Sequence, residues 1–198
     1  MQTERQKEII EVALDLIADK GIQGLTIKNL ARQIGISEPA IYRHYENKIE
    51  ILLSILDVFR ISSAKLFEEA AKENTGALDK IQHLFSTHFA AFTGNPSLVA
   101  VIFSEEIFRN EPVLVKKISE IVSQNDTMLI SIISAGQSSG EIRNDLDASH
   151  LAIMVMGSLR LFVKRWQFSD YSFNLSNEGQ TFLKSVIKMI TANRMNSQ

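Results

Sequence analysis

The sequence predicts an all-α protein, and three observations lead to this prediction. Only three prolines and nine glycines interrupt 198 residues, so long stretches keep apolar residues at spacings of three and four. No segment shows the strict polar–apolar alternation of a strand between two turn signals. Polar caps and glycine stops divide the chain into about nine helices. Three short helices, one long connecting helix and a larger helical part predict an N-terminal domain of residues 1–48 and a C-terminal domain of residues 49–198.

The first two predicted helices are short and have clear boundaries. The first covers residues 3–20, carries isoleucines, leucines and an alanine on one face, and stops at Gly21. Thr26 is expected to cap the second helix, because its hydroxyl can accept a hydrogen bond from an otherwise unpaired backbone N–H. Gly35 ends this helix, since a sharp turn there needs a positive φ that glycine reaches at little cost.

Within residues 26–48, three positions have the spacing of a helix-turn-helix. Ala31 lies within the apolar pattern of the second helix, and its small side chain lets another helix cross close by. Gly35 makes the turn, and Ile41 returns as the inward residue of a third helix. Ser37 is expected to cap that helix, with Pro39 in its first turn, where a missing N–H costs nothing. The second helix of such a motif enters the DNA major groove.

The remaining helices are predicted from caps and breaks. Asn47 caps a long fourth helix, and a fifth carries leucine, isoleucine, histidine and phenylalanine at helical spacing as far as Phe92. After a break at residues 94–97, the expected helices are a short one ending near Ile107, a long one over residues 112–138, one over residues 147–166 and one over residues 176–192.

Composition limits the classes of function. The formal net charge is −2, so any contact with nucleic acid must come from a local patch. The absence of cysteine removes disulfides, thiolate chemistry and Cys-ligated zinc, and no cofactor is expected. The N-terminus lacks the pattern of a signal peptide. The most apolar run, residues 151–163, is too short to span a bilayer and contains Arg160. We expect a cytoplasmic protein without a membrane partner.

The outward residues of the third helix have the chemistry of a DNA-contacting surface. Residues 26–48 carry four basic and two acidic side chains, so the patch is only weakly basic. Arg43 can donate two hydrogen bonds to guanine, and Ala40 can touch a thymine methyl. Glu38 can accept from cytosine or can only repel phosphate; the sequence leaves both open. Tyr42 and Lys48 can reach phosphates, although Tyr42 can also close the small core.

Residues 9–60 resemble the N-terminal domain of the TetR/AcrR family of bacterial repressors. Gly21 precedes LTIKNLARQIGIS, and IYRHYENKIEIL follows; the most family-specific part is the cluster of residues 41–45 with Asn47 and Lys48. Residues 139–147 are similar to the turn before the dimer helices of many members. Two residues depart from the family pattern: Tyr45 stands where Phe is common, and Glu46 lowers the local positive charge.

The resemblance implies contacts residue by residue. It places Thr26, Tyr42, His44 and Lys48 at positions that contact phosphate. Together with the capping Ser37 and the positions near bases, the expected DNA-contacting set is Thr26, Lys28, Ser37, Glu38, Pro39, Ala40, Tyr42, Arg43, His44 and Lys48. We expect a homodimer on a palindromic operator in double-stranded DNA, with half-sites about 34–36 Å apart or a multiple of that distance.

The resemblance also implies that residues 49–198 bind a small effector and form the dimer. These residues are rich in Phe and Met, which suit either a filled core or an apolar pocket for a hydrophobic or aromatic molecule. The expected pocket consists of His88, Phe89, Phe92, Phe103, Met128 and Met154. Residues 151–163 are apolar on nearly all sides, so one face is expected to pack on its own domain and another on a partner, through the last two helices.

Two other classes of function remain as alternatives. A helical metalloenzyme would need ligands such as His83, His88, His150, Glu105 and Glu106, but His83 and His88 point to different helix faces and no HExxH pair exists. An adaptor would use the helix-turn-helix to bind a protein, which the phosphate-contacting set disfavours. The sequence therefore predicts a ligand-responsive DNA-binding repressor that is not an enzyme.

Overall fold

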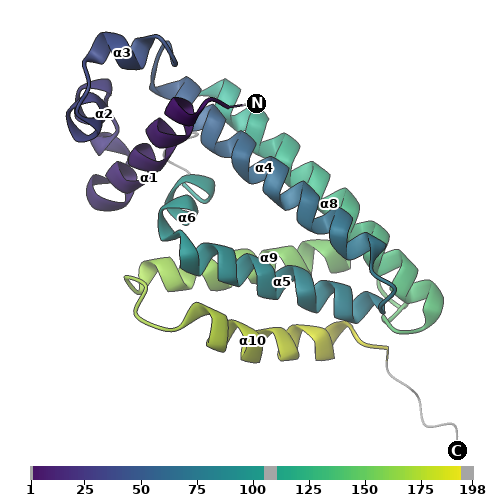
Figure 1. Ribbon diagram of the computed structural model, residues 1–198. Coiled ribbons are helices and arrows are strands. Elements are labelled where there is room, and N and C mark those ends of the chain that lie inside the picture. The colour runs from purple at the N-terminus through teal and green to yellow at the C-terminus, as the bar shows by residue number, and fades with distance from the viewer. Residues whose placement is uncertain (1, 105–110, 193–198) are drawn as a thin grey trace, which may run out of the picture. The chain divides into compact units, whose positions relative to one another are not determined.

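The computed structural model describes residues 2–104 and 111–192. Within these residues the chain forms nine α-helices and no β-strand, with one isolated β-bridge between Ile142 and Thr191 (Figure 1). The predicted all-α class is therefore confirmed. The predicted end of the short helix near Ile107 lies outside the described residues.

The chain divides into two compact units, which are described separately. As far as their residues are described, the first contains Met1–Ile61 and Asn95–Glu120, and the second contains Ser62–Gly94 and Ile121–Gln198. Two long helices contribute to both units, namely α4 (Lys48–Lys72) and α8 (Pro112–Ser139). The functional boundary at residues 48 and 49 stays a prediction.

The first unit is built on three short helices near the N-terminus. Its elements besides α4 and α8 are α1 (Glu4–Gly24), α2 (Ile27–Ile34), α3 (Glu38–Tyr42) and α6 (Pro96–Ile102). Helix α1 packs against α2 and α6, and α2 packs against α3. Ile9, Leu30 and Ile41 are completely buried and form the core between these helices.

Local signals fix the ends of these helices. Thr3 caps α1 reciprocally with Gln6, as in a capping box. The predicted end at Gly21 is a kink, because Gly21 has a φ of 65° and helical structure resumes for three further residues. The N–H of Asn29 donates to Thr26 Oγ1 at 3.1 Å, which confirms Thr26 as the cap of α2. Gly35 has the expected left-handed conformation, with a φ of 80°.

The second unit has an aromatic core between α5 (Ala77–Gly94), α9 (Ala148–Phe168) and α10 (Leu175–Ile190). These three helices lie side by side, with α10 packed on both of the others (Figure 1). The Phe89 and Phe162 rings are 5.9 Å apart, and Phe162 stacks on Phe182 at 4.5 Å. Gly179 of α10 lies directly on the Phe89 ring, so its lack of a side chain sets the α5–α10 separation.

Candidate nucleic-acid interface

The turn between α2 and α3 has the geometry of a helix-turn-helix. The backbone N–H groups of Gly35 and Ile36 both donate to the Ala31 carbonyl at 3.0 Å, which closes the turn. Ile41 is fully buried, as predicted, and Tyr45, about one turn further along the chain, is 4% exposed. Burial raises the pKa of the Tyr45 phenol, with a smaller contribution of the same sign from Glu50.

Helix α3 is short and ends before Arg43, one of its predicted outward residues. It comprises only Glu38–Tyr42, and Arg43 takes the C-cap position. The N–H of His44 donates to the Ile41 carbonyl at 2.8 Å, so the chain tightens into a turn immediately after the helix. Ser37 occupies the N-cap position, but its hydroxyl makes no capping hydrogen bond. Arg43 and His44 are therefore presented by a turn that follows the helix.

All ten predicted DNA-contacting residues lie in the first unit, and none is buried. Tyr42 is 51% exposed, so it does not close the small core. Ala40 and His44 are partly exposed, and the rest of the set is exposed: Thr26, Lys28, Ser37, Glu38, Pro39, Tyr42, Arg43 and Lys48. We call these ten residues the recognition surface.

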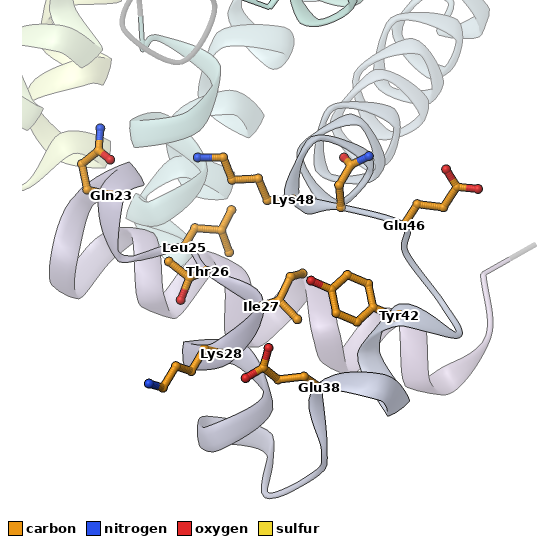
Figure 2. Close-up of a pocket in the computed structure, with 10 residues that line it drawn as sticks. Gln23, Leu25, Thr26, Ile27, Lys28, Glu38, Tyr42, Glu46 and Lys48 are labelled. Carbon is orange, nitrogen blue, oxygen red and sulfur yellow. The ribbon is translucent and has the colours of Figure 1, made fainter.

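Part of the recognition surface lines an open groove of about 390 Å³ (Figure 2). The groove takes residues from the end of α1, from α2, from α3 and from the start of α4: Gln23, Leu25, Thr26, Ile27, Lys28, Glu38, Tyr42, Glu46, Asn47 and Lys48. Figure 2 shows the Glu38 carboxylate on the side where Lys28 lies, whereas the Glu46 carboxylate points away from the groove. The groove thus combines two lysines and several hydrogen-bonding side chains with two glutamates and the apolar Leu25 and Ile27.

Asn47 fixes the position of Lys48 at the start of α4. Its side-chain oxygen accepts hydrogen bonds from the N–H groups of Ile49 at 2.8 Å and Glu50 at 3.2 Å. In turn, Glu50 Oε2 accepts from the N–H of Glu46 at 2.7 Å. These bonds satisfy backbone donors at a helix N-terminus, where a lysine is electrostatically unfavourable. These bonds fix the backbone at the exposed Lys48, so its position does not depend on an anionic partner within the motif.

The groove also includes residues that sequence reasoning did not assign to it. Gln23 comes from the end of α1, outside residues 26–48, and no local spacing indicates its position. Asn47 was predicted only as a helix cap, yet it lines the same groove. The position of Asn47 in the groove could have been predicted because it directly precedes Lys48, and a cap and the first helical residue lie in the same turn of backbone.

The predicted effector-pocket residues are distributed over several surroundings. His88, Phe89 and Phe92 are buried in the second unit, but Phe89 joins the α9–α10 aromatic core whereas His88 and Phe92 lie beside each other on another face of α5. Met128 is partly exposed and Met154 is 45% exposed. Phe103 is partly exposed and belongs to the first unit. Their role as pocket residues stays a prediction.

The described residues form neither a metal site nor a membrane-spanning helix. In residues 2–104 and 111–192, no three His, Cys, Asp or Glu side chains gather as a metal site would require. Two of the ligands considered from sequence, Glu105 and Glu106, lie outside the described residues. Among the described helices, none is both long and apolar enough to cross a membrane.

The fold and the recognition surface define the class: an all-α protein with an N-terminal helix-turn-helix for binding DNA. Comparison with known families agrees with this class. Residues 9–55 match the family described as "Bacterial regulatory proteins, tetR family", and residues 63–189 match "YsiA-like protein, C-terminal region". The chain belongs to the TetR family and is a transcriptional regulator.

Individual relatives support the same assignment over the whole chain. The "Fatty acid metabolism regulator protein" of Bacillus subtilis is 28% identical over 192 residues, which cover 96% of this chain and 98% of that protein. The "HTH-type transcriptional repressor KstR2" of Rhodococcus jostii is 22% identical and covers 92% of this chain and 89% of its own length. One of these relatives is thus described as a regulator and the other as a transcriptional repressor.

Solved structures show the same fold. The crystal structure of FadR from Bacillus subtilis in complex with stearoyl-CoA has a TM-score of 0.80 at 26% identity and covers 93% of this chain and 98% of that one. The fatty acid degradation regulator FadR from Bacillus halodurans has a TM-score of 0.85 at 19% identity, with full coverage of both chains.

Proposed function

We propose that this protein is a cytoplasmic, homodimeric repressor that binds a palindromic operator and releases it when a long-chain acyl-CoA binds. The observation that carries this proposal is the exposed recognition surface on a helix-turn-helix with a buried Ile41 and a left-handed Gly35. In this reading residues 1–48 bind DNA, and residues 49–198 bind the effector and the second copy.

The recognition surface supports a division of roles. Thr26, Tyr42, His44 and Lys48 contact phosphates and position the motif, because phosphate contacts set register but carry little sequence information. The residues that approach base edges are Lys28, Glu38, Pro39, Ala40 and Arg43. Arg43, which is exposed directly after α3, is suited to guanine O6 and N7. The modest local charge means that two copies and specific contacts supply most of the affinity.

The exposed face of α9 supports the homodimer. Leu151, Val155 and Leu159 are buried within the unit, whereas Ile153 is 63% exposed and Leu161 is 71% exposed. A Cβ added at Gly157, which lies between these two exposed residues, would meet no atom within 4 Å. An apolar helix face with a small residue at its centre allows a second helix to approach closely. In contrast, the outward side of α10 is largely polar, so α9 contributes the apolar part of the interface.

The nature of the effector is inferred from the relatives. The FadR structure from Bacillus subtilis is described in complex with stearoyl-CoA, and that chain is 26% identical to this one. The KstR2 repressors are more distant, at 22% and 24% identity. Helix α4 is continuous from Lys48 to Lys72, so it can carry a change at an effector site to the recognition surface. An acyl-CoA shifts that equilibrium only by binding one form more tightly.

The DNA-binding proposal is tested by selecting binding sites from random duplexes with the full-length protein. We expect enrichment of a palindrome, with an affinity that falls steeply as salt rises. Arg43→Ala should cost about 1–3 kcal/mol and relax the preference at one base position. If no palindrome is enriched and Arg43→Ala has no effect, the protein-adaptor alternative takes precedence.

The effector proposal needs a separate measurement on the selected operator. Palmitoyl-CoA and stearoyl-CoA should release the protein from the duplex at micromolar concentrations, and free coenzyme A should not. Release by none of these thioesters would contradict the effector class while leaving operator recognition intact.

A further inference from the structure

Two buried polar side chains in the second unit are not used by the DNA-binding function. His88 of α5 is 7% exposed and Asn125 of α8 is 6% exposed. Asn125 interrupts an apolar helix stripe, since Ile121 and Leu129, one turn away on either side, are each 1% exposed. Burying a polar group is costly unless it is hydrogen-bonded. We call His88 and Asn125 the polar pair.

Each member of the polar pair has one hydrogen bond and one nitrogen without a partner. His88 Nδ1 lies 2.8 Å from the Leu84 carbonyl oxygen, so Nδ1 carries the proton and Nε2 is left as an acceptor. The Ser63 hydroxyl donates to Asn125 Oδ1 at 3.2 Å, which leaves the Asn125 amide NH₂ as a donor. In the described part of the chain, neither His88 Nε2 nor Asn125 Nδ2 makes a hydrogen bond.

These two nitrogens also border accessible space. Both nitrogens lack a hydrogen-bond partner, but among the described residues neither is fully enclosed by protein atoms. Each therefore keeps some surface that a water molecule or a ligand atom can reach. A ligand-binding site requires a few polar groups that are buried, fixed in position and able to donate or accept a further hydrogen bond. The two nitrogens supply one donor and one acceptor of this kind.

Helix α4 brings the polar pair into one neighbourhood. Ser63, which bonds to Asn125, and Phe67, whose ring lies 6.3 Å from the His88 ring, are four residues apart on α4 and both buried. One helical turn separates them by about 6 Å along the axis. Phe92 borders His88 on its own helix, with the ring centres 6.0 Å apart. His88 thus lies between two aromatic rings, and the Phe67 ring comes from α4 one turn after the residue that bonds to Asn125.

The chemistry of the pair selects a particular kind of ligand group. Burial lowers the pKa of His88, against a smaller opposite effect of the Leu84 hydrogen bond, so the ring is neutral. A neutral Nε2 accepts a hydrogen bond from a donor and repels a carboxylate, whereas the Asn125 amide donates a hydrogen bond to an oxygen. A hydroxyl or a secondary amide satisfies both groups, and a carboxylate satisfies only one and is costly to desolvate.

We propose that His88 and Asn125 recognise a neutral group of the effector that both donates and accepts hydrogen bonds, a hydroxyl or an amide on an otherwise apolar molecule. This inference rests on the proposed effector-binding role of the second unit. In an acyl-CoA, such a group can come from a hydroxylated acyl chain or from the amides of the pantetheine arm.

The test measures binding of a matched twelve-carbon series to the full-length protein by calorimetry: dodecanol, dodecanamide and dodecanoate. We expect the alcohol and the amide to bind about tenfold more tightly than the acid. His88→Phe keeps an aromatic ring beside Phe67 and Phe92, and Asn125→Leu keeps the side-chain volume. His88→Phe should remove most of the preference for the alcohol and leave the affinity for the acid nearly unchanged. Asn125→Leu should weaken all three probes, because each has an oxygen that can accept from the Asn125 amide.

Controls separate recognition from folding. Ser86→Ala also removes a polar group from α5, but one that accepts from Gln180 of α10 at 2.6 Å, so it should keep the wild-type preference. If His88→Phe does not fold, the weaker binding of all three probes to Asn125→Leu carries the test. Equal binding of alcohol and acid by the wild type, an unchanged preference in His88→Phe, an undiminished affinity in Asn125→Leu, or no binding of any probe (a site that holds only water) would each overturn the proposal.

Two thioesters distinguish the sources of the group. If a chain hydroxyl is recognised, the variants weaken 3-hydroxydodecanoyl-CoA by about tenfold and spare dodecanoyl-CoA; if a pantetheine amide is recognised, both weaken equally. No operator enters these measurements. If an acyl-CoA does not release the DNA, the measured binding preference is unaffected. If the binding preference is absent, operator recognition is unaffected.

Discussion

The recognition surface and the interior of the second unit depend on different properties of the chain. The recognition surface is a set of exposed or partly exposed residues, most of them polar, held by backbone geometry, in which Gly35 turns the chain and Asn47 fixes the start of α4. The second unit holds its residues by packing, with Phe89, Phe162 and Gly179 in direct contact across three helices. We therefore expect glycine, polar and apolar substitutions to act by different mechanisms in the two regions.

The largest loss of operator affinity is expected from a substitution in the second unit that prevents dimer formation. Leu161→Glu puts a charge on the apolar face of α9, where the native side chain is 71% exposed in the single chain. We expect a monomer by sedimentation and a loss of operator affinity of about 100-fold or more, because two linked half-sites bind far more tightly than one.

A matched substitution controls for the added charge in the dimer experiment. Ile61→Glu on α4 replaces an apolar side chain that is 58% exposed, and it should leave the dimer intact. A Leu161→Glu protein that remains a dimer would show that α9 does not form the interface.

In the second unit, Gly179→Ala should destabilise the fold through packing. The added Cβ would lie 2.6 Å from two ring carbons of Phe89, which is itself fully buried. We expect a loss of about 1–3 kcal/mol in the free energy of unfolding, measured with urea. Gly94→Ala, whose Cβ would meet nothing within 4 Å, should not lose stability. Combining Gly179→Ala with Phe89→Leu should recover part of the loss if packing is the cause.

In the first unit, Gly35→Ala should act through the backbone alone. A Cβ at Gly35 would meet no atom within 4 Å, but the φ of 80° is unfavourable for alanine. We expect a loss of about 1 kcal/mol on unfolding and a smaller loss for Gly35→Asn, since asparagine tolerates this conformation better. Equal losses for both variants would indicate that contacts, and not the backbone angle, determine the cost.

The same contrast explains what the sequence could predict. Local signals at Thr26, Gly35, Pro39 and Asn47 act on backbone a few residues away, so the helix-turn-helix and its exposed side could be predicted from local spacing. The length of α3 was harder, because the chain tightens after Tyr42 and helix propensity does not show this.

The interior of the second unit was less predictable for a physical reason. His88 and Phe89 are neighbours in sequence, and the helix turns them to different partners, α4 in one case and α9 in the other. Which side chains share a space depends on residues such as Ser63 and Asn125, 62 positions apart. Apolar spacing predicted that Phe92 and His88 are buried, but it could not predict which residues face each of them.

The smallest expected effect is a pH dependence that belongs to the second unit. Burial lowers the pKa of His88 below its ordinary value of 6.5, so between these two values the unfolded chain binds more protons than the folded one. This contribution to stability is complete above pH 6.5 and is lost as the pH falls toward the lowered pKa. Burial raises the pKa of Asp126 above 3.8, so its contribution has the opposite sign: stability is gained as the pH falls through the raised pKa and is complete below pH 3.8. We expect the melting temperature of the wild type to fall more steeply on acidification than that of His88→Phe, and we expect Asp126→Asn to make the fall steeper still.

Parallel curves for the wild type and His88→Phe would contradict this prediction, because they would show that the pKa of His88 is the same in the folded chain as in water. The basis for discrimination against a carboxylate would then be lost.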